Sequence, residues 1–175
     1  MCAEGSFEPE ADVKVLQDPN REYKIHRMIL GLPESSSEMG GQFPLNMNLH
    51  LLEGVSFDKG CYIGQELTQR TFHTGVIRKV ALPFALDSSP HISIDAMNFD
   101  PYVMHDQGFD LDLKGENIVD EKGKKLGKVL TNSTNMGIAL VDLTKLNKNG
   151  SNHKYSIAEH RAFLWQPAWM DMHID

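Results

Sequence analysis

Apolar residues recur with helical spacing near the start of the chain. Four of them fall on one face of an α-helix, at Ile25, Met28, Ile29 and Leu32. Pro19 suits the first position of such a helix, and Gly31 with Pro33 would end it. The pattern predicts an amphipathic helix over residues 19–30.

Weaker signals follow this helix. Three serines and two glycines predict a loop over residues 33–44, and an apolar-rich stretch predicts a short helix or turn over residues 45–52. Helix-forming residues predict another helix over 65–71, and Gly75 would end it.

Short apolar runs typical of strands dominate the second half. They are separated by turns rich in glycine and asparagine, and lie at residues 76–82, 92–94, 117–120, 124–131, 136–143 and 162–165. A further strand is predicted at 12–16, and residues 95–115 are expected to form a loop or insertion. This pattern predicts an α+β protein whose second part is a small antiparallel β-barrel or sandwich.

Composition narrows the possible functions. The 175 residues are 41% apolar and 23% charged, as in globular proteins, with 17 basic and 24 acidic side chains and a net charge of −7. This balance argues against binding nucleic acid or anionic membranes by bulk charge. No apolar run approaches the roughly 20 residues of a membrane span. We therefore expect neither a nucleic-acid nor a membrane partner.

The richest chemistry lies in residues 59–66, which read Lys-Gly-Cys-Tyr-Ile-Gly-Gln-Glu. Cys61 precedes a predicted helix, whose amides and dipole would favour the thiolate, and Lys59 would add to this effect. Gly60 and Gly64 would let the backbone turn or approach a ligand. The alternative is that Cys61 is simply a small buried core residue.

Polar side chains continue beyond the thiol. Gln65 and Glu66 lie beside it, and helical spacing would bring Glu66, Arg70 and His73 onto one face. The eight histidines lack the close pairing of a structural zinc site, so we expect them to be solvated or packed.

The segment 59–66 resembles the signature of the YgfZ-type branch of the GcvT-like, folate-binding family. Flanking stretches are similar to the family too, and lie at residues 27–34, 43–45, 48–49, 54–57, 70–78 and 123–140. The residues around the signature resemble those of the mitochondrial members, which are assembly factors for [4Fe–4S] proteins.

This resemblance implies ferredoxin-like α/β subdomains followed by a C-terminal β-barrel. It assigns residues 1–75 to the end of the folate-binding α/β domain and residues 76–175 to the barrel. The family's layout places a long region before the signature, so we expect this chain to be an N-terminally truncated remnant. The implied location is the mitochondrial matrix.

The resemblance also implies cofactors and partners. Cys61 would be the functional thiol, with Lys59 beside it. Tetrahydrofolate would be contacted by the surrounding positions Gly60, Tyr62, Gly64, Gln65, Glu66, Arg70 and His73. An iron–sulfur cluster would be bound only transiently and shared with a partner's cysteines, with Cys61 as one ligand. The alternative is that Cys61 does redox chemistry rather than ligation. Expected partners are A-type iron–sulfur carriers, a ferredoxin and [4Fe–4S] client proteins.

Two alternatives remain open from the residues. One is a folate-dependent one-carbon transferase, and the other is an inactive remnant. In the related aminomethyltransferases a glutamate contacts the pterin, whereas the corresponding position here is Ile29. Isoleucine cannot hydrogen-bond a pterin, although helical periodicity alone also explains Ile29 as part of the apolar stripe. An assembly factor is therefore the favoured hypothesis over a classical enzyme.

Overall fold

The computed structural model describes residues 19–87, 111–146 and 155–170. Its helical elements are α1 (Pro19–Ile29), α2 (Ser36–Met39), η1 (Pro44–Met47), α3 (Gln65–Thr74) and η3 (Leu143–Lys145). Its strands are β1 (Lys79–Leu86), β2 (Asn117–Val119), β3 (Lys125–Ser133), β4 (Met136–Asp142), β5 (Tyr155–Ile157) and β6 (His160–Leu164).

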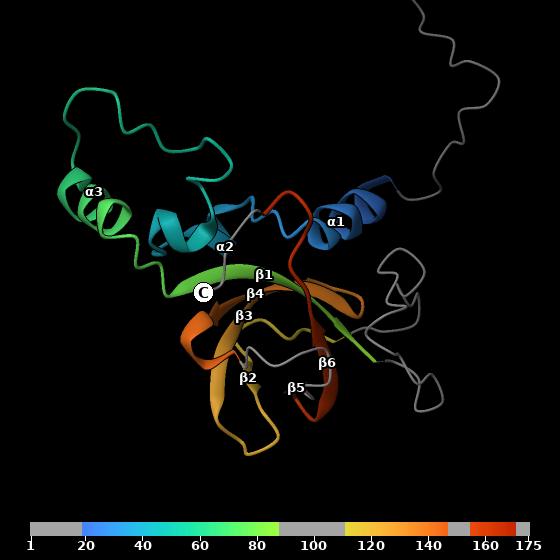
Figure 1. Ribbon diagram of the computed structural model, residues 1–175. Coiled ribbons are helices and arrows are strands. Elements are labelled where there is room, and N and C mark those ends of the chain that lie inside the picture. Colours follow the sequence, from blue (N-terminus) through green and yellow to red (C-terminus); the bar gives the residue numbers. More distant parts are fainter. Residues whose placement is uncertain (1–18, 88–110, 147–154, 171–175) are drawn as a thin grey trace, which may run out of the picture.

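The strands form a closed antiparallel barrel in the order β1-β4-β3-β2-β5-β6, and β6 pairs with β1 to close it (Figure 1). The predicted α+β class with a C-terminal barrel is therefore confirmed. Strand β5 was not predicted, because three residues are too few to show an apolar alternation. The predicted strands at 12–16 and 92–94, and most of the predicted insertion at 95–115, lie outside the described residues.

Strand β1 is buried on both of its faces. Val80, Leu82 and Phe84 point into the barrel, while the small Ala81 and Ala85 face the helical layer outside it. This double burial explains why the run is apolar at successive positions. The strand begins three residues later than predicted, because its ladder starts where Lys79 pairs with Asp142 of β4.

Helix α1 packs against the outer face of the barrel, as its apolar stripe predicts. Ile25 and Ile29 contact Ala85 and Met136, and Met28 joins a neighbouring cluster with Ala81. The short helix or turn predicted at 45–52 is confirmed as η1 and the turns that follow it. The last turn of η1 is tied to β1 by Asn48, whose side-chain amide donates to the Ala81 carbonyl over 2.7 Å.

Residues 165–170 return to the end of α1. The Trp169 indole N–H donates to the Leu30 carbonyl over 2.7 Å, and Met170 is buried in the barrel core. Gly31 fits here because its φ is +65° and a Cβ would lie 2.9 Å from Cδ of Pro83. The division of the chain at residue 75 stays a prediction.

Candidate functional site

The signature lies on a projection from the body of the protein. We call residues 58–79 the arm; they contain the signature, helix α3, the link to β1 and the first residue of β1. In Figure 1 α3 lies to one side of the barrel, at the end of a long loop that follows η1. Among the described elements, α3 packs chiefly against η1. The arm is therefore much less covered than α1.

Cys61 is exposed and is a free thiol. The alternative that it is a small buried core residue is therefore wrong. An exposed thiol can reach a partner's metal or a redox partner without the fold opening. The expectation that the helix and Lys59 favour its thiolate stays a prediction.

Three neighbours of the thiol hold its loop. The side-chain oxygen of Gln65 accepts a hydrogen bond from the backbone N–H of Tyr62 over 3.1 Å. The Lys59 ammonium lies 4.8 Å from the centre of the Tyr62 ring. The Tyr62 side chain is only partly exposed. Lys59, Tyr62 and Gln65 thus interact with one another around Cys61, which supports a positioning role.

The two signature glycines differ. Gly64 is the N-cap of α3 and has a φ of +88°, a conformation that side chains other than glycine rarely adopt. A Cβ added at Gly60 or Gly64 would meet nothing within 4 Å. Gly64 is therefore explained by backbone conformation rather than by a close approach of other protein atoms.

Helix α3 runs from Gln65 to Thr74, slightly beyond its predicted end, and Gly75 caps it with a φ of +68°. The predicted face of Glu66, Arg70 and His73 is exposed throughout. Arg70 forms an ion pair with Glu66 one turn earlier. These two side chains satisfy each other at the surface.

The base of the arm is aromatic. Phe72 of α3 stacks on Phe57 with ring centres 3.9 Å apart, and makes a T-shaped contact with His50 with ring centres 6.3 Å apart. Burial lowers the pKa of His50, which favours its neutral form. This contact joins α3 to the segments that precede the signature.

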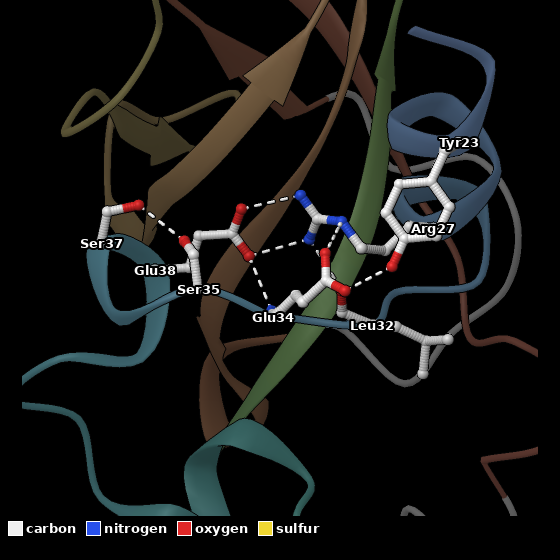
Figure 2. A network of polar contacts seen from close by, with 7 residues as sticks. All are labelled: Tyr23, Arg27, Leu32, Glu34, Ser35, Ser37 and Glu38. Carbon is white, nitrogen blue, oxygen red and sulfur yellow. Dashed lines mark hydrogen bonds and ion pairs between the residues drawn. The ribbon is translucent and has the colours of Figure 1, made fainter. Parts of the chain in front are cut away.

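A second polar cluster lies between α1 and α2, in the stretch 23–38 (Figure 2). Both guanidinium Nη atoms of Arg27 donate to the carboxylate of Glu38 over 2.8 Å, and Nη1 also donates to the Leu32 carbonyl. Glu34 contributes its backbone N–H to Glu38, and its carboxylate lies 3.4 Å from Arg27 Nε and accepts from the Tyr23 hydroxyl. This network fixes the chain after α1.

Burial of Glu38 raises its pKa, but hydrogen bonds from Arg27, Glu34 and Thr131 and the Arg27 charge outweigh that effect. The net result is a pKa below the ordinary value for glutamate, so the carboxylate stays ionised. Neither Glu38 nor α2 was predicted, although Ser35 and Glu38 have the spacing of a helix-capping box. Glu38 pairs with Arg27 instead of capping, which no local pattern reveals.

The site of the pterin contact in aminomethyltransferases does not fit a folate here. Ile29 is 4% exposed and packs with Ile25, Ala85 and Met136. A pterin would find no hydrogen-bonding side chain at this position. The tetrahydrofolate contacts expected from the resemblance stay predictions.

Neither a metal-binding cluster nor a membrane-spanning helix is found in the part of the chain that the structure describes. No group of three or more His, Cys, Asp or Glu side chains in this part of the chain could hold a metal ion. No helix within the described ranges has the length and apolar character to cross a membrane.

Comparison with known proteins agrees with the architecture. Residues 94–172 match the family model of the CAF17 C-terminal beta-barrel domain. The chain is also similar to proteins named "Iron-sulfur cluster assembly factor IBA57 homolog, mitochondrial" in three fungi. Identity is 34% over 157 residues in Coccidioides immitis, covering 82% of this chain and 36% of the relative. In Aspergillus fumigatus it is 37% over 166 residues, covering 89% and 36%. In Cryptococcus neoformans it is 38% over 132 residues, covering 70% and 35%.

The chain thus spans about a third of the length of these relatives. The relatives are mitochondrial by name, which confirms the expected mitochondrial location, whereas the matrix stays a prediction. Signature, barrel and relatives agree: the chain belongs to the GcvT-like family, and the relatives that it matches are named mitochondrial iron–sulfur cluster assembly factors.

Proposed function

We propose that this chain takes part in iron–sulfur cluster assembly, late in the maturation of mitochondrial [4Fe–4S] proteins, with Cys61 as its working thiol. The observation that carries the proposal is the exposure of Cys61 on the family signature. The names of the relatives support the general process. The late step and the matrix are inferred from the family resemblance.

The cluster is the cargo in this proposal, and one thiol cannot hold it. Clusters usually take four cysteine ligands. Cys61 therefore supplies one thiolate, and an A-type carrier supplies the others. On binding, the thiol loses its proton and its sulfur takes one iron coordination position. Lys59, Tyr62 and Gln65 keep the loop in place while the cluster is shared.

The test is a titration of the 175-residue chain with an A-type carrier that holds a [2Fe–2S] cluster. We expect co-elution on a sizing column and a visible spectrum that differs from that of the loaded carrier alone. Cys61→Ser should lose the spectral change, while Cys2→Ser, which removes the other cysteine, should keep it. Transfer to a [4Fe–4S] client that is equal for wild type and Cys61→Ser would refute the thiol role.

A folate-dependent one-carbon transferase is less well supported, because Ile29 is buried where related transferases present a carboxylate. Any link to tetrahydrofolate is therefore proposed only as an accompaniment of cluster assembly. Equilibrium dialysis of tetrahydrofolate against the chain tests this link, and an absence of saturable binding would refute it.

A further inference from the structure

Helix α3 has little buried surface. Of its ten residues, only Thr68 is buried. The ring of Phe72 joins the helix to the body of the protein, because it stacks on Phe57 and makes a T-shaped contact with His50. Phe72 is itself 39% exposed. We call the three rings of Phe57, Phe72 and His50 the latch, since they connect α3 to the segment that follows η1.

Both ends of α3 lie at glycines. Gly64 and Gly75 have φ angles of +88° and +68°, and a Cβ built at either would meet no other atom within 4 Å. The chain is therefore uncrowded at both ends, so the helix can move there as a unit. Elements with few buried contacts open at a lower cost in free energy than core strands do. We therefore expect α3 to separate from the body while the barrel stays folded.

The imidazole of His50 is suited to control this opening. The side chain is half-buried, and its Nδ1 atom is buried with no hydrogen-bond partner among the described residues. In an imidazolium both ring nitrogens carry a proton. A proton at Nδ1 would then be a buried, charged donor without an acceptor, which costs more than leaving a neutral nitrogen unpaired. The closed latch therefore favours the neutral ring.

Charged neighbours do not account for this preference within the described part of the chain. Burial is the cause of the lowered pKa of His50, and no ion pair or like charge adds to it. Helix η1 carries no titratable side chain. The titratable groups on the other segments at the latch are all exposed, and they are Glu53 and Asp58 on the segment of His50 itself, and Glu66, Arg70 and His73 on α3. The preference for the neutral ring therefore comes from the position of His50.

We propose that the latch is a pH-sensitive device: the neutral His50 ring keeps α3 docked, and the ring moves into water when it takes up a proton, which releases the helix. With α3 released, the pKa of His50 returns to its ordinary value of about 6.5. Docking is therefore strongest above this pH and weakens as the pH falls toward the lowered pKa of the docked ring. The released arm carries Cys61 with it, so the device changes where this thiol can reach.

The experiment measures amide hydrogen exchange of the full chain at about pH 7.5 and about pH 5.5, with intrinsic rates corrected for pH. This window lies above the titration of ordinary carboxyl groups. The amides of α3 should lose protection severalfold at the lower pH, because the open state becomes more populated. The amides of β3 and β4 should keep theirs. Equal losses in α3 and in these strands would indicate global unfolding and would overturn the inference.

Two variants and one control separate His50 from its surroundings. His50→Phe keeps an aromatic ring at the latch but cannot take up a proton, so the protection of α3 should be the same at both pH values. His73→Gln is the matched control, because it removes the exposed imidazole that also contacts Phe72. This control should lose protection at the lower pH as wild type does. A pH dependence that persists in His50→Phe, or disappears in His73→Gln, would contradict the device.

A measurement on the wild-type chain keeps the test independent of whether His50→Phe folds. Titration of the His50 imidazole by NMR should give a midpoint below about 6.5, and the protection of α3 should change over the same pH range. A midpoint at or above this value, or a ring that titrates while α3 stays protected, would overturn the inference. The latch does not rest on the proposed function: Cys61→Ser should keep the pH dependence of α3, whatever its effect on cluster transfer.

Discussion

An arginine–glutamate ion pair occurs in two regions of the molecule, buried in one and exposed in the other. Between α1 and α2, Arg27 and Glu38 pair at 2.8 Å with side chains 8% and 5% exposed. On α3, Arg70 and Glu66 pair with side chains 66% and 85% exposed. The first pair joins two segments of the fold, whereas the second joins neighbouring turns of one helix. The comparison shows a fixed helical layer on the barrel beside an arm whose groups stay accessible.

The largest difference between the two regions should appear on removing an aromatic ring. Phe84→Ala leaves a cavity in the barrel core and should lower the free energy of unfolding by about 3–5 kcal/mol. Phe72→Ala loses a stacked but partly exposed ring, and should cost about 1 kcal/mol. Urea unfolding measures both. Similar losses for the two variants would contradict the contrast between core and arm.

The buried ion pair should come next. Arg27→Met leaves the Glu38 carboxylate buried without its partner, and should cost about 3 kcal/mol in urea unfolding. Combining it with Glu38→Leu should recover part of this loss, because no buried charge remains. Arg70→Met is the matched control on the arm. A double variant less stable than Arg27→Met would argue against an electrostatic origin.

Lowering the pH should have a smaller effect on folding stability, and this effect should depend on the buried Glu38. The folded state holds the pKa of Glu38 below its ordinary value, so the unfolded chain takes up this proton at a higher pH. The resulting stability is complete above the ordinary pKa and is lost as the pH falls through the lowered one. Urea midpoints measured from about pH 6 down to about pH 3 should fall more steeply for wild type than for Glu38→Gln. Equal slopes would exclude a linked proton at Glu38.

The smallest effect is expected at the exposed pair. Glu66→Gln breaks a solvated contact and should change the free energy of unfolding by less than about 0.5 kcal/mol. Thermal melts at low and high salt provide the measurement. A loss comparable with that of Arg27→Met would mean that the arm is as tightly integrated as α1.

Much of the fold could be predicted because its signals are local. The apolar stripe of α1, the capping glycine after α3 and the short apolar runs of β3 and β4 all depend on residues close in sequence. Strand β5 and helix α2 were missed for a related reason. Each is too short to show a period. In addition, β5 pairs with β2 from earlier in the chain, and α2 is held by Arg27 of α1.

The candidate site was less predictable than the fold. The signature identified Cys61, but a cysteine beside Tyr62 and Ile63 reads equally well as a core residue, and only the structure shows it to be exposed. The bond from Tyr62 to Gln65 and the stack of Phe72 on Phe57 depend on backbone geometry that the sequence does not specify. Hence the sequence located the site, while the roles of its neighbours required coordinates.

The bond between Trp169 and Leu30 also has a consequence for the order of synthesis. The two residues are 139 positions apart, and Pro167 next to Gly31 belongs to the same contact. During synthesis α1 therefore emerges from the ribosome long before Trp169, which bonds to the end of this helix. Strand β6, which closes the barrel, also emerges late. The apolar stripe of α1 packs against β1 and β4, so it stays exposed to solvent until these later strands have been synthesised.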